Sequence, residues 1–397
     1  MLSHSIPFFP HHRADFFAQF PASAAVFMLR GADPAAEPYV SKTANLRRRL
    51  FRLLSPADSQ SKRLNLRERA ATIEYSLTGS DFESTLLLYR LFRQEFPRTY
   101  QKRLRLHAPA LIRFNLENAY PRAYVTNKLG RLSARSIYYG PFRSRAIAEK
   151  FMNDSLDLFK IRRCTFELHP DPAYPGCVYS EMKMCLAPCF KGCTDEAYAA
   201  EVGRVQAYFD SKGDSLLGEL EKERDRLSAE MEFEAAAQVH TKVAKIKGIL
   251  SACDEISGRL DQLDAVIVQP SPQPGSVALF RFRHGTFTGP EQFSVESESE
   301  SLDSRLRTAL QQMPDVHARS ATQFGEELAI LKRWFYRTHK TGEIVVAGEN
   351  GELSVRKLAN ALMRVFRGEK LPAKAAQPEA NPASAAQNGP VEDKPPL

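Results

Sequence analysis

The pattern of hydrophobic and polar positions in the first hundred residues predicts a small α/β module. Three β-prone apolar stretches fit short strands, at 20–29, 37–41 and 71–79. Two stretches with helical spacing fit helices, at 45–54 and 81–96. Asn45 is a suitable N-cap for the first, and Pro97 ends the second. The residues before this pattern, 1–19, are expected to form a loose N-terminal extension.

The middle of the chain changes from a mixed pattern to a helical one. Strand-like segments (IRFNLE and AYVTNK), the turn Tyr139-Gly-Pro-Phe142 and a helix at 146–159 precede a cysteine-rich stretch. From 196 to 252 apolar residues recur at helical spacing, with a break at Glu232-Phe233-Glu234. Helices this short bury little surface alone, so a partner helix pair would complete their core; packing on their own domain is the alternative.

The last third alternates again and predicts a small α+β domain ending near residue 368. The tail from Leu371 has six prolines in 27 residues and is expected to be disordered. The chain is therefore predicted to be a multidomain α/β protein. Its expected parts are the extension 1–19, an α/β domain 20–105, a cysteine-bearing linker region 106–195, a helical region 196–255, an α+β domain 256–370 and the tail 371–397.

The charge of the chain points to an acidic partner. The net charge is +8 with a pI near 9.1, and nine Lys or Arg but only two acids lie between Lys42 and Arg69. Two further basic groups follow, at 90–105 and 143–163. A solvated surface would explain any one group, but three groups interleaved with aromatic residues favour contact with a nucleic-acid backbone.

The composition argues against a membrane role. No apolar run approaches the roughly 18 residues that span a bilayer. The first twenty residues lack the features of a signal peptide, so a cytoplasmic location is expected, where disulfides are rare.

Four of the six cysteines lie within 26 residues, at Cys164, Cys177, Cys185 and Cys189, and Cys193 follows. Four thiolates this close in sequence can surround one metal centre, although unliganded thiols are the alternative. Zinc usually takes two short Cys-x2-4-Cys pairs, and among these four cysteines only Cys185 and Cys189 form one, so an iron–sulfur cluster fits the wider spacing better. Cys253 stands alone and is expected to be a small buried hydrophobe.

The histidines are weak candidates for ligands. The nine histidines contain no pair at metal-binding spacing except His11 and His12, in the expected loose extension. We expect His107, His240 and His284 to be surface or packed residues. No phosphate-binding lysine loop and no G-x-S-x-G sequence is present, so nothing supports nucleotide hydrolysis or serine chemistry.

Taken in order, these features resemble UvrC, the nuclease subunit of bacterial nucleotide excision repair, and its shorter homologue Cho. The likeness covers about 20 to 370 and is most specific in the cysteine spacing with Cys-Leu-Ala-Pro-Cys. It implies a four-iron cluster held by Cys164, Cys177, Cys185 and Cys189, with the role of Cys193 open. The segment Met231-Glu-Phe-Glu-x-Ala-Ala237 resembles the UVR motif, which implies docking on UvrB through Met231, Phe233 and Ala236. The family's RNase H-like and helix-hairpin-helix domains are not present, so no second incision is expected.

The first hundred residues resemble a GIY-YIG nuclease domain, which cuts on the 3′ side of a lesion. Such a site uses a tyrosine near the attacking water, an arginine on the phosphate and a glutamate that binds one divalent metal. The resemblance assigns Tyr39, Lys42 and Arg49 to this site. The family's first tyrosine, a glycine and the metal-binding glutamate are replaced by Phe27, Ser41 and Leu88. Basic side chains of the first helix are assigned to DNA, namely Arg47, Arg48 and Arg52.

Whether the chain is an enzyme is therefore left open between two interpretations. In the first, a UvrC-like protein binds DNA and UvrB but has an impaired nuclease site. In the second, a Cho-like endonuclease uses Mg²⁺ or Mn²⁺ to make one nick 3′ of a lesion, through a metal ligand not identified in the sequence. Leucine offers no lone pair to a metal, which favours the first. No metal ligand is assigned.

Overall fold

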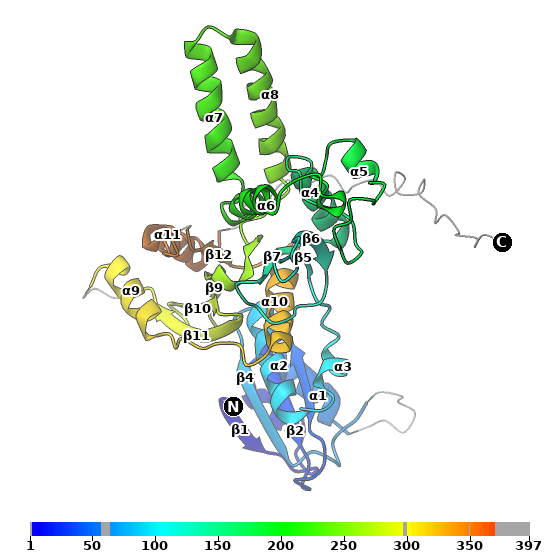
Figure 1. The fold of residues 1–397 in the computed structure, drawn as a ribbon. Helices are drawn as coiled ribbons and strands as arrows, with labels where there is room; N and C mark the ends of the chain where they lie inside the picture. The colour runs from blue at the N-terminus through cyan, green and yellow to red at the C-terminus, as the bar shows by residue number, and fades with distance from the viewer. Residues whose placement is uncertain (1, 57–63, 297–299, 349, 370–397) are drawn as a thin grey trace, which may run out of the picture. The chain divides into compact units, whose positions relative to one another are not determined.

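The computed structural model describes residues 2–56, 64–296, 300–348 and 350–369 (Figure 1). They form two compact units. Among the described residues, one unit joins the N-terminal part up to 109, a short segment at 128–132 and residues 259–369; the other contains 110–127 and 133–258. The tail that we expected to be disordered lies outside the described residues.

The N-terminal module is an antiparallel sheet in the order β1-β4-β2-β3. Its strands are β1 (His4–Pro7), β4 (Thr72–Leu77), β2 (Ala25–Arg30) and β3 (Tyr39–Thr43). The three predicted strands are confirmed. The expectation of a loose extension is wrong: β1 pairs with β4, a 3-10 helix follows at Ala14–Gln19, and Phe8, Phe17 and Phe20 are buried in the core. The aromatic residues of this segment bury enough apolar surface to fix it.

Two helices cover the two faces of this sheet because the strand residues alternate in direction. Helix α1 (Leu46–Leu54) packs on the face of Phe27 and Leu29, and Asn45 caps it by accepting a hydrogen bond from the Arg48 amide, as predicted. Helix α2 (Asp81–Glu95) begins after its cap Ser80 and packs on the face of Val26 and Met28. The short α3 (Tyr100–Leu104) follows.

The C-terminal module of the same unit is also built on an antiparallel sheet, in the order β11-β10-β9-β12. Its strands are β9 (Ala265–Pro270), β10 (Ser276–Arg283), β11 (Thr286–Ser294) and β12 (Glu343–Val346), and a 3-10 turn at Leu260–Gln262 precedes them. The helices are α9 (Leu302–Gln312), α10 (Ala321–Phe335) and α11 (Val355–Phe366). This part of the chain thus combines strands and helices, and α9 and α11 complete one core.

The two modules of this unit pack against each other through α2, which the sequence did not lead us to expect. The ring of Phe82 lies against Phe280, Phe287 and Trp334, with ring centroids 5.1 to 5.5 Å apart. The guanidinium of Arg90 is buried and donates to the carbonyl oxygens of Phe287 and Gly289, at 2.8 and 2.6 Å. Side chains of helix α2 therefore pack against both modules.

The second unit holds a sheet in the order β6-β5-β7-β8, made of β5 (Ala110–Asn115), β6 (Arg122–Thr126), β7 (Ser136–Phe142) and the short β8 (Gly258–Arg259). Helix α4 (Arg145–Leu156) and helix α6 (Asp195–Asp210) contribute to its aromatic core. The cysteine-rich loop lies between them and contains only α5 (Val178–Glu181) and a 3-10 turn (Pro188–Phe190).

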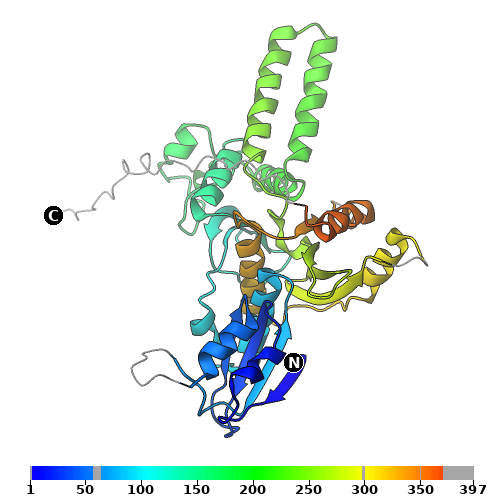
Figure 2. The ribbon, with the colours of Figure 1, turned by 180° about the vertical axis from the view of Figure 1, so that it is seen from behind.

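The predicted helical region forms an antiparallel hairpin, which projects from the rest of the second unit in both views (Figures 1 and 2). Helix α7 (Asp214–Ala229) and helix α8 (Phe233–Leu250) are joined by a tight turn in which Met231 has a positive φ of 63°. No helix among the described residues is both long and apolar enough to cross a bilayer.

Candidate functional sites

The N-terminal module brings together two of the three predicted catalytic residues. The Nη2 of Arg49, on α1, donates a hydrogen bond of 2.8 Å to the hydroxyl of Tyr39, on β3. The Phe27 ring lies 6.1 Å from the Tyr39 ring and is fully buried. Phe27 therefore occupies the space beside Tyr39 without offering a hydroxyl group.

The third predicted residue, Lys42, lies in a separate ionic cluster. Its ammonium group is 2.6 Å from the Asp81 carboxylate and 2.8 Å from the Thr85 hydroxyl, both on α2. Arg337, from the C-terminal module, forms a second ion pair with Asp81. Burial opposes ionisation of Asp81, but the hydrogen bonds and charges of Lys42 and Arg337 outweigh it and lower the pKa of this carboxyl. Asp81 is thus fully engaged by two cations.

The position where the resemblance requires a metal-binding glutamate is apolar. Leu88 packs with a cluster formed by Val26, Met28, Val40 and neighbouring residues of α2. Counting along the helix places Asp81 two turns away on the same face, about 10 Å along the axis. The neighbouring Tyr89 is buried and donates to the Glu326 carboxylate at 2.9 Å. Asp81 lies too far along the helix and Tyr89 has no carboxylate, so neither residue provides a metal ligand beside Leu88.

Basic side chains of α1 remain exposed beside this site. Arg47, Arg48 and Arg52 are exposed, and so is the ring of Phe51, which is 46% exposed. Arg47 also donates to the Phe20 carbonyl oxygen at 2.7 Å, so this side chain has a structural contact as well. Arg49 is turned inward, toward Tyr39. The exposed arginines can reach phosphate groups without disturbing the Tyr39–Arg49 pair.

The cysteine-rich loop of the second unit forms a pocket. Four of its lining residues are the predicted ligands Cys164, Cys177, Cys185 and Cys189, whereas Cys193 is not among the residues that line it. Three non-glycine residues with positive φ fold the loop tightly, namely Lys183, Ala187 and Lys191. The loop therefore places the four predicted cysteines around one pocket.

The electrostatics of this pocket depend on burial and on mutual repulsion. Burial, followed by the charges of neighbouring cysteines, raises the pKa of the Cys185 thiol to about 11, although the Ala187 amide donates to its sulfur at 3.3 Å. Burial also raises the pKa of Cys164. Two arginines flank the sulfurs, and the Nε atoms of Arg162 and Arg163 are buried without a hydrogen-bond partner. Four thiolates would need a cation at their centre. The charge of Arg162 lowers the pKa of Cys164, whereas Arg163 is paired with Asp157 at 2.7 Å.

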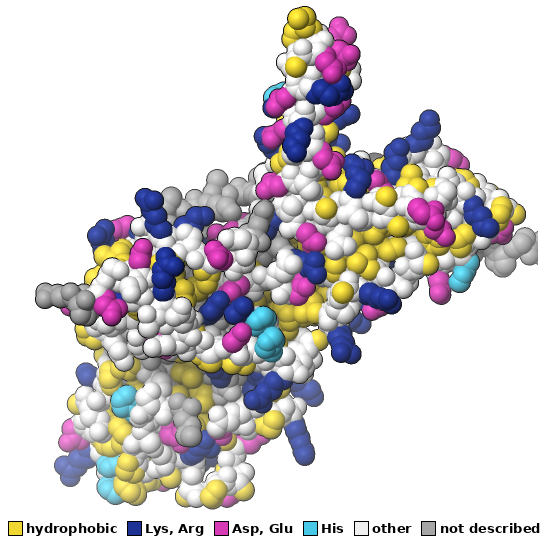
Figure 3. Space-filling model, turned by 60° about the vertical axis from the view of Figure 1, so that its left-hand side comes forward, with side chains coloured by type: hydrophobic (Ala, Val, Ile, Leu, Met, Phe, Trp, Pro, Cys, Tyr) yellow, Lys and Arg dark blue, Asp and Glu magenta, His cyan; other side chains and the backbone are white. Residues whose placement is uncertain are grey.

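The turn of the α7–α8 hairpin exposes large apolar side chains. Met231 is 77% exposed and Phe233 is 66% exposed, and Ala236 is partly buried. Hydrophobic atoms are visible at the end of the projecting hairpin in Figure 3. Further down the hairpin, Val239, Val243 and Ile246 are buried. The apolar side chains of the hairpin are thus buried toward its base and exposed at its tip.

Some residues of these clusters were not found from the sequence. Arg337 and Glu326 come from the C-terminal module, more than 220 residues after their partners on α2 and α3. Only the packing of the two modules brings them there. The exposure of Phe233 could be inferred, because it interrupts the helical pattern.

Comparison with known proteins identifies two of these parts. Residues 111–208 match the model of the UvrC/Cho excinuclease middle domain, and residues 214–249 match the UvrB/uvrC motif. In these two parts the chain is similar to the UvrC/Cho excinucleases, as the cysteine spacing and the hairpin indicated.

Several curated proteins named UvrABC system protein C are similar to this chain. The protein of Methanothermobacter thermautotrophicus is 25% identical over 320 residues, which are 80% of this chain and 53% of the relative. That of Solibacter usitatus is 27% identical, over 75% of this chain and 47% of the relative. That of Stenotrophomonas maltophilia strain K279a is 22% identical, over 87% of this chain and 58% of the relative. The chain spans about half the length of these relatives. No solved structure matches it.

Proposed function

We propose that this protein acts in nucleotide excision repair by binding DNA and UvrB, with a GIY-YIG-like nuclease site that is impaired. DNA is bound by the exposed arginines of α1, Arg48 and Arg52 above all. UvrB is bound by the apolar tip of the α7–α8 hairpin around Met231 and Phe233. The observation that carries the impaired nuclease is the environment of Leu88, whose side chain belongs to an apolar cluster where a metal ligand is needed.

The proposal extends to the cysteine pocket, which we assign to a four-iron cluster held by Cys164, Cys177, Cys185 and Cys189. The four sulfurs line one pocket and are flanked by arginines, which fits an anionic metal–sulfur group. Such a cluster supplies structural cross-linking and electron-transfer capacity when bound. The chain's own contribution is to hold the loop between α4 and α6 in one conformation.

A second candidate is an active Cho-like endonuclease that nicks DNA 3′ of a lesion. The hydrogen bond between Arg49 and Tyr39 favours it, because this pair is assembled as a nuclease of this type requires. In that case Mg²⁺ or Mn²⁺ would be held by a ligand from outside the cluster around Leu88. Lys42 would then have to leave Asp81 in order to contact the phosphate.

The experiment that separates the two candidates is an incision assay on a duplex with one defined lesion. Protein purified without oxygen is combined with UvrA, UvrB and Mg²⁺ or Mn²⁺, and Arg49→Ala serves as the control. Binding of DNA and of UvrB is measured on the same samples. We expect binding without a nick above the level of the control. A 3′ nick made by the wild type and lost in Arg49→Ala would establish the active endonuclease instead.

A further inference from the structure

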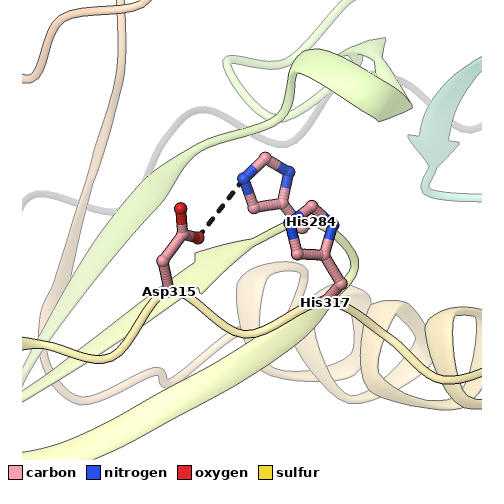
Figure 4. Close-up of side chains that lie close together, drawn as sticks. All are labelled: His284, Asp315 and His317. Atoms are coloured by element: carbon pink, nitrogen blue, oxygen red, sulfur yellow. Dashed lines mark ion pairs between the residues drawn. The ribbon is translucent and has the colours of Figure 1, made fainter.

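A cluster of two histidines and one aspartate lies in the C-terminal module, far along the chain from the residues assigned above. Its members are His284, Asp315 and His317, whose ligand atoms all lie within 4.8 Å of one another (Figure 4). His284 comes from the turn between β10 and β11, and the other two come from the segment between α9 and α10. This cluster could not be recognised in the sequence, because His284 and His317 are 33 positions apart.

The backbone fixes the position of His284. His284 and Gly285 form a two-residue hairpin turn with φ of 49° and 76°, and the flanking residues Arg283 and Thr286 are paired across the two strands. A side chain at Gly285 would collide with the ring of Phe324, so the turn is pressed onto α10. Histidine is one of the few larger residues that tolerates positive φ. The imidazole therefore stands on a rigid support.

The segment with the other two ligands is attached to the same turn. The amide of Ala318 donates to the carbonyl oxygen of His284 at 3.1 Å, which holds His317 next to the turn. The two imidazole rings are stacked, with centroids 4.0 Å apart and planes 10° apart. An oxygen of the Asp315 carboxylate lies 3.3 Å from the Nε2 of His284.

These distances suit a small transition-metal ion. Zinc bonds of about 2.0 to 2.1 Å in a tetrahedron separate neighbouring ligand atoms by about 3.3 Å, the separation already present between His284 and Asp315. The His317 ring must leave the stack to complete the triangle, and its exposed position allows that rotation. Two imidazoles and one carboxylate are a common zinc ligand set, with the fourth position open to water.

The guanidinium of Arg283 already forms an ion pair with one residue of this cluster, Asp315. The Arg283 guanidinium lies 3.3 Å from Asp315 and 3.4 Å from Asp264, and Asp264 is also paired with Arg281. The contact with Asp315 is largely exposed, and exposed ion pairs contribute little, about 0 to 1 kcal/mol. A divalent ion can therefore displace Arg283 from Asp315, while Asp264 keeps the guanidinium in place.

We propose that His284, Asp315 and His317 form a zinc site that fastens the β10–β11 turn to the segment preceding α10. The occupant is a borderline divalent transition ion, for which Zn²⁺ is the natural probe. This site is independent of the cysteine pocket and of the function proposed above. It uses nitrogen and oxygen ligands only.

The test is calorimetric titration of the full-length protein with Zn²⁺, combined with X-ray absorption at the zinc edge for the adduct with one equivalent. We expect one site whose first shell is nitrogen and oxygen at about 2.0 to 2.1 Å, without sulfur at about 2.3 Å. His317→Gln and Asp315→Asn should each weaken binding at least about tenfold. Both positions are exposed, so the variants should fold, which a thermal melt verifies.

Two further variants sharpen the test. Arg283→Gln should strengthen zinc binding severalfold, because it releases Asp315 from its competing partner. His240→Gln, an exposed histidine on α8, should leave the affinity unchanged. A sulfur shell in the wild type would place the zinc in the cysteine pocket and overturn the proposal. Unchanged affinity in His317→Gln, or no binding to the wild type, would do the same.

Discussion

The Nη2 of Arg49 lies 2.8 Å from the hydroxyl oxygen of Tyr39 and donates a hydrogen bond to it. The Nε of the same guanidinium is buried and has no hydrogen-bond partner. Arg49 is therefore held in place by Tyr39 while one of its donors is buried without a partner, which is uncommon for a buried polar group. Leu88 stands where the resemblance requires a metal ligand. The effect of this difference can be tested by introducing a carboxylate at this position.

Replacing Leu88 by glutamate, together with Phe27→Tyr and Ser41→Gly, should restore metal-dependent incision. The carboxylate would bind one divalent ion and the new phenol would stand beside Tyr39, so the rate should rise roughly 10³-fold above wild type. The measurement is the lesion incision assay with Mn²⁺. The matched control carries Leu88→Gln, which introduces a polar group of similar size that binds the ion poorly. Equal rates for the two variants would refute this account of the site.

The exposed arginines of α1 should set the salt dependence of DNA binding. Each phosphate contact with duplex DNA adds about 0.9 to the slope of log affinity against log salt, because bound counterions are released. Replacing Arg48 and Arg52 by glutamine should therefore lower the slope by about 1.8. Lys222→Gln with Lys242→Gln, two exposed lysines of the hairpin, makes the same change in charge and should leave the slope intact. Equal slopes in all three proteins would show that α1 does not contact DNA.

The tip of the α7–α8 hairpin should carry the affinity for UvrB. Phe233→Glu places a charge on a side chain that is 66% exposed, so the fold should tolerate it while an apolar interface should not. We expect the loss of detectable association in a calorimetric titration with UvrB. Val316→Glu, at another exposed apolar residue, is the matched control and should bind normally. Normal binding by Phe233→Glu would remove the hairpin from the interface.

Substitution of single cysteines should distinguish the four that line the pocket from Cys193. Serine at any of the four lining cysteines should reduce the iron content and the visible absorbance of protein purified without oxygen. Cys193→Ser should change neither, because Cys193 is not among the residues that line the pocket. Iron and sulfide assays, normalised to protein, provide the measurement. Loss of iron in Cys193→Ser would assign this cysteine to the ligand set.

The elements of this protein could be predicted from its sequence, but the contacts between modules could not. The cap at Asn45 and the strands around Phe27 depend on neighbouring residues, and the structure has them where the pattern placed them. The break in the helical region was predicted at Glu232-Phe233-Glu234, but Phe233 and Glu234 already belong to α8, so the turn lies slightly earlier in the chain. The pairing of β1 with β4 was missed, because a four-residue strand carries too little alternation to be recognised. Likewise, Arg337 reaches Asp81 only after two separately folded sheets have packed on α2.

This ionic contact between modules makes stability depend on pH in a defined direction. The pKa of Asp81 is lowered in the folded protein, so its contribution is present above the unfolded value of about 3.9 and is lost as the pH falls through the lower folded value. Since the carboxylate is about half exposed, the contribution should stay below about 1 kcal/mol. Urea unfolding from pH 7 to pH 3 should show Asp81→Asn less stable than wild type at pH 7, with the difference shrinking in acid. A difference that stays constant over this range would mean that the ionised Asp81 contributes nothing to the packing of the two modules.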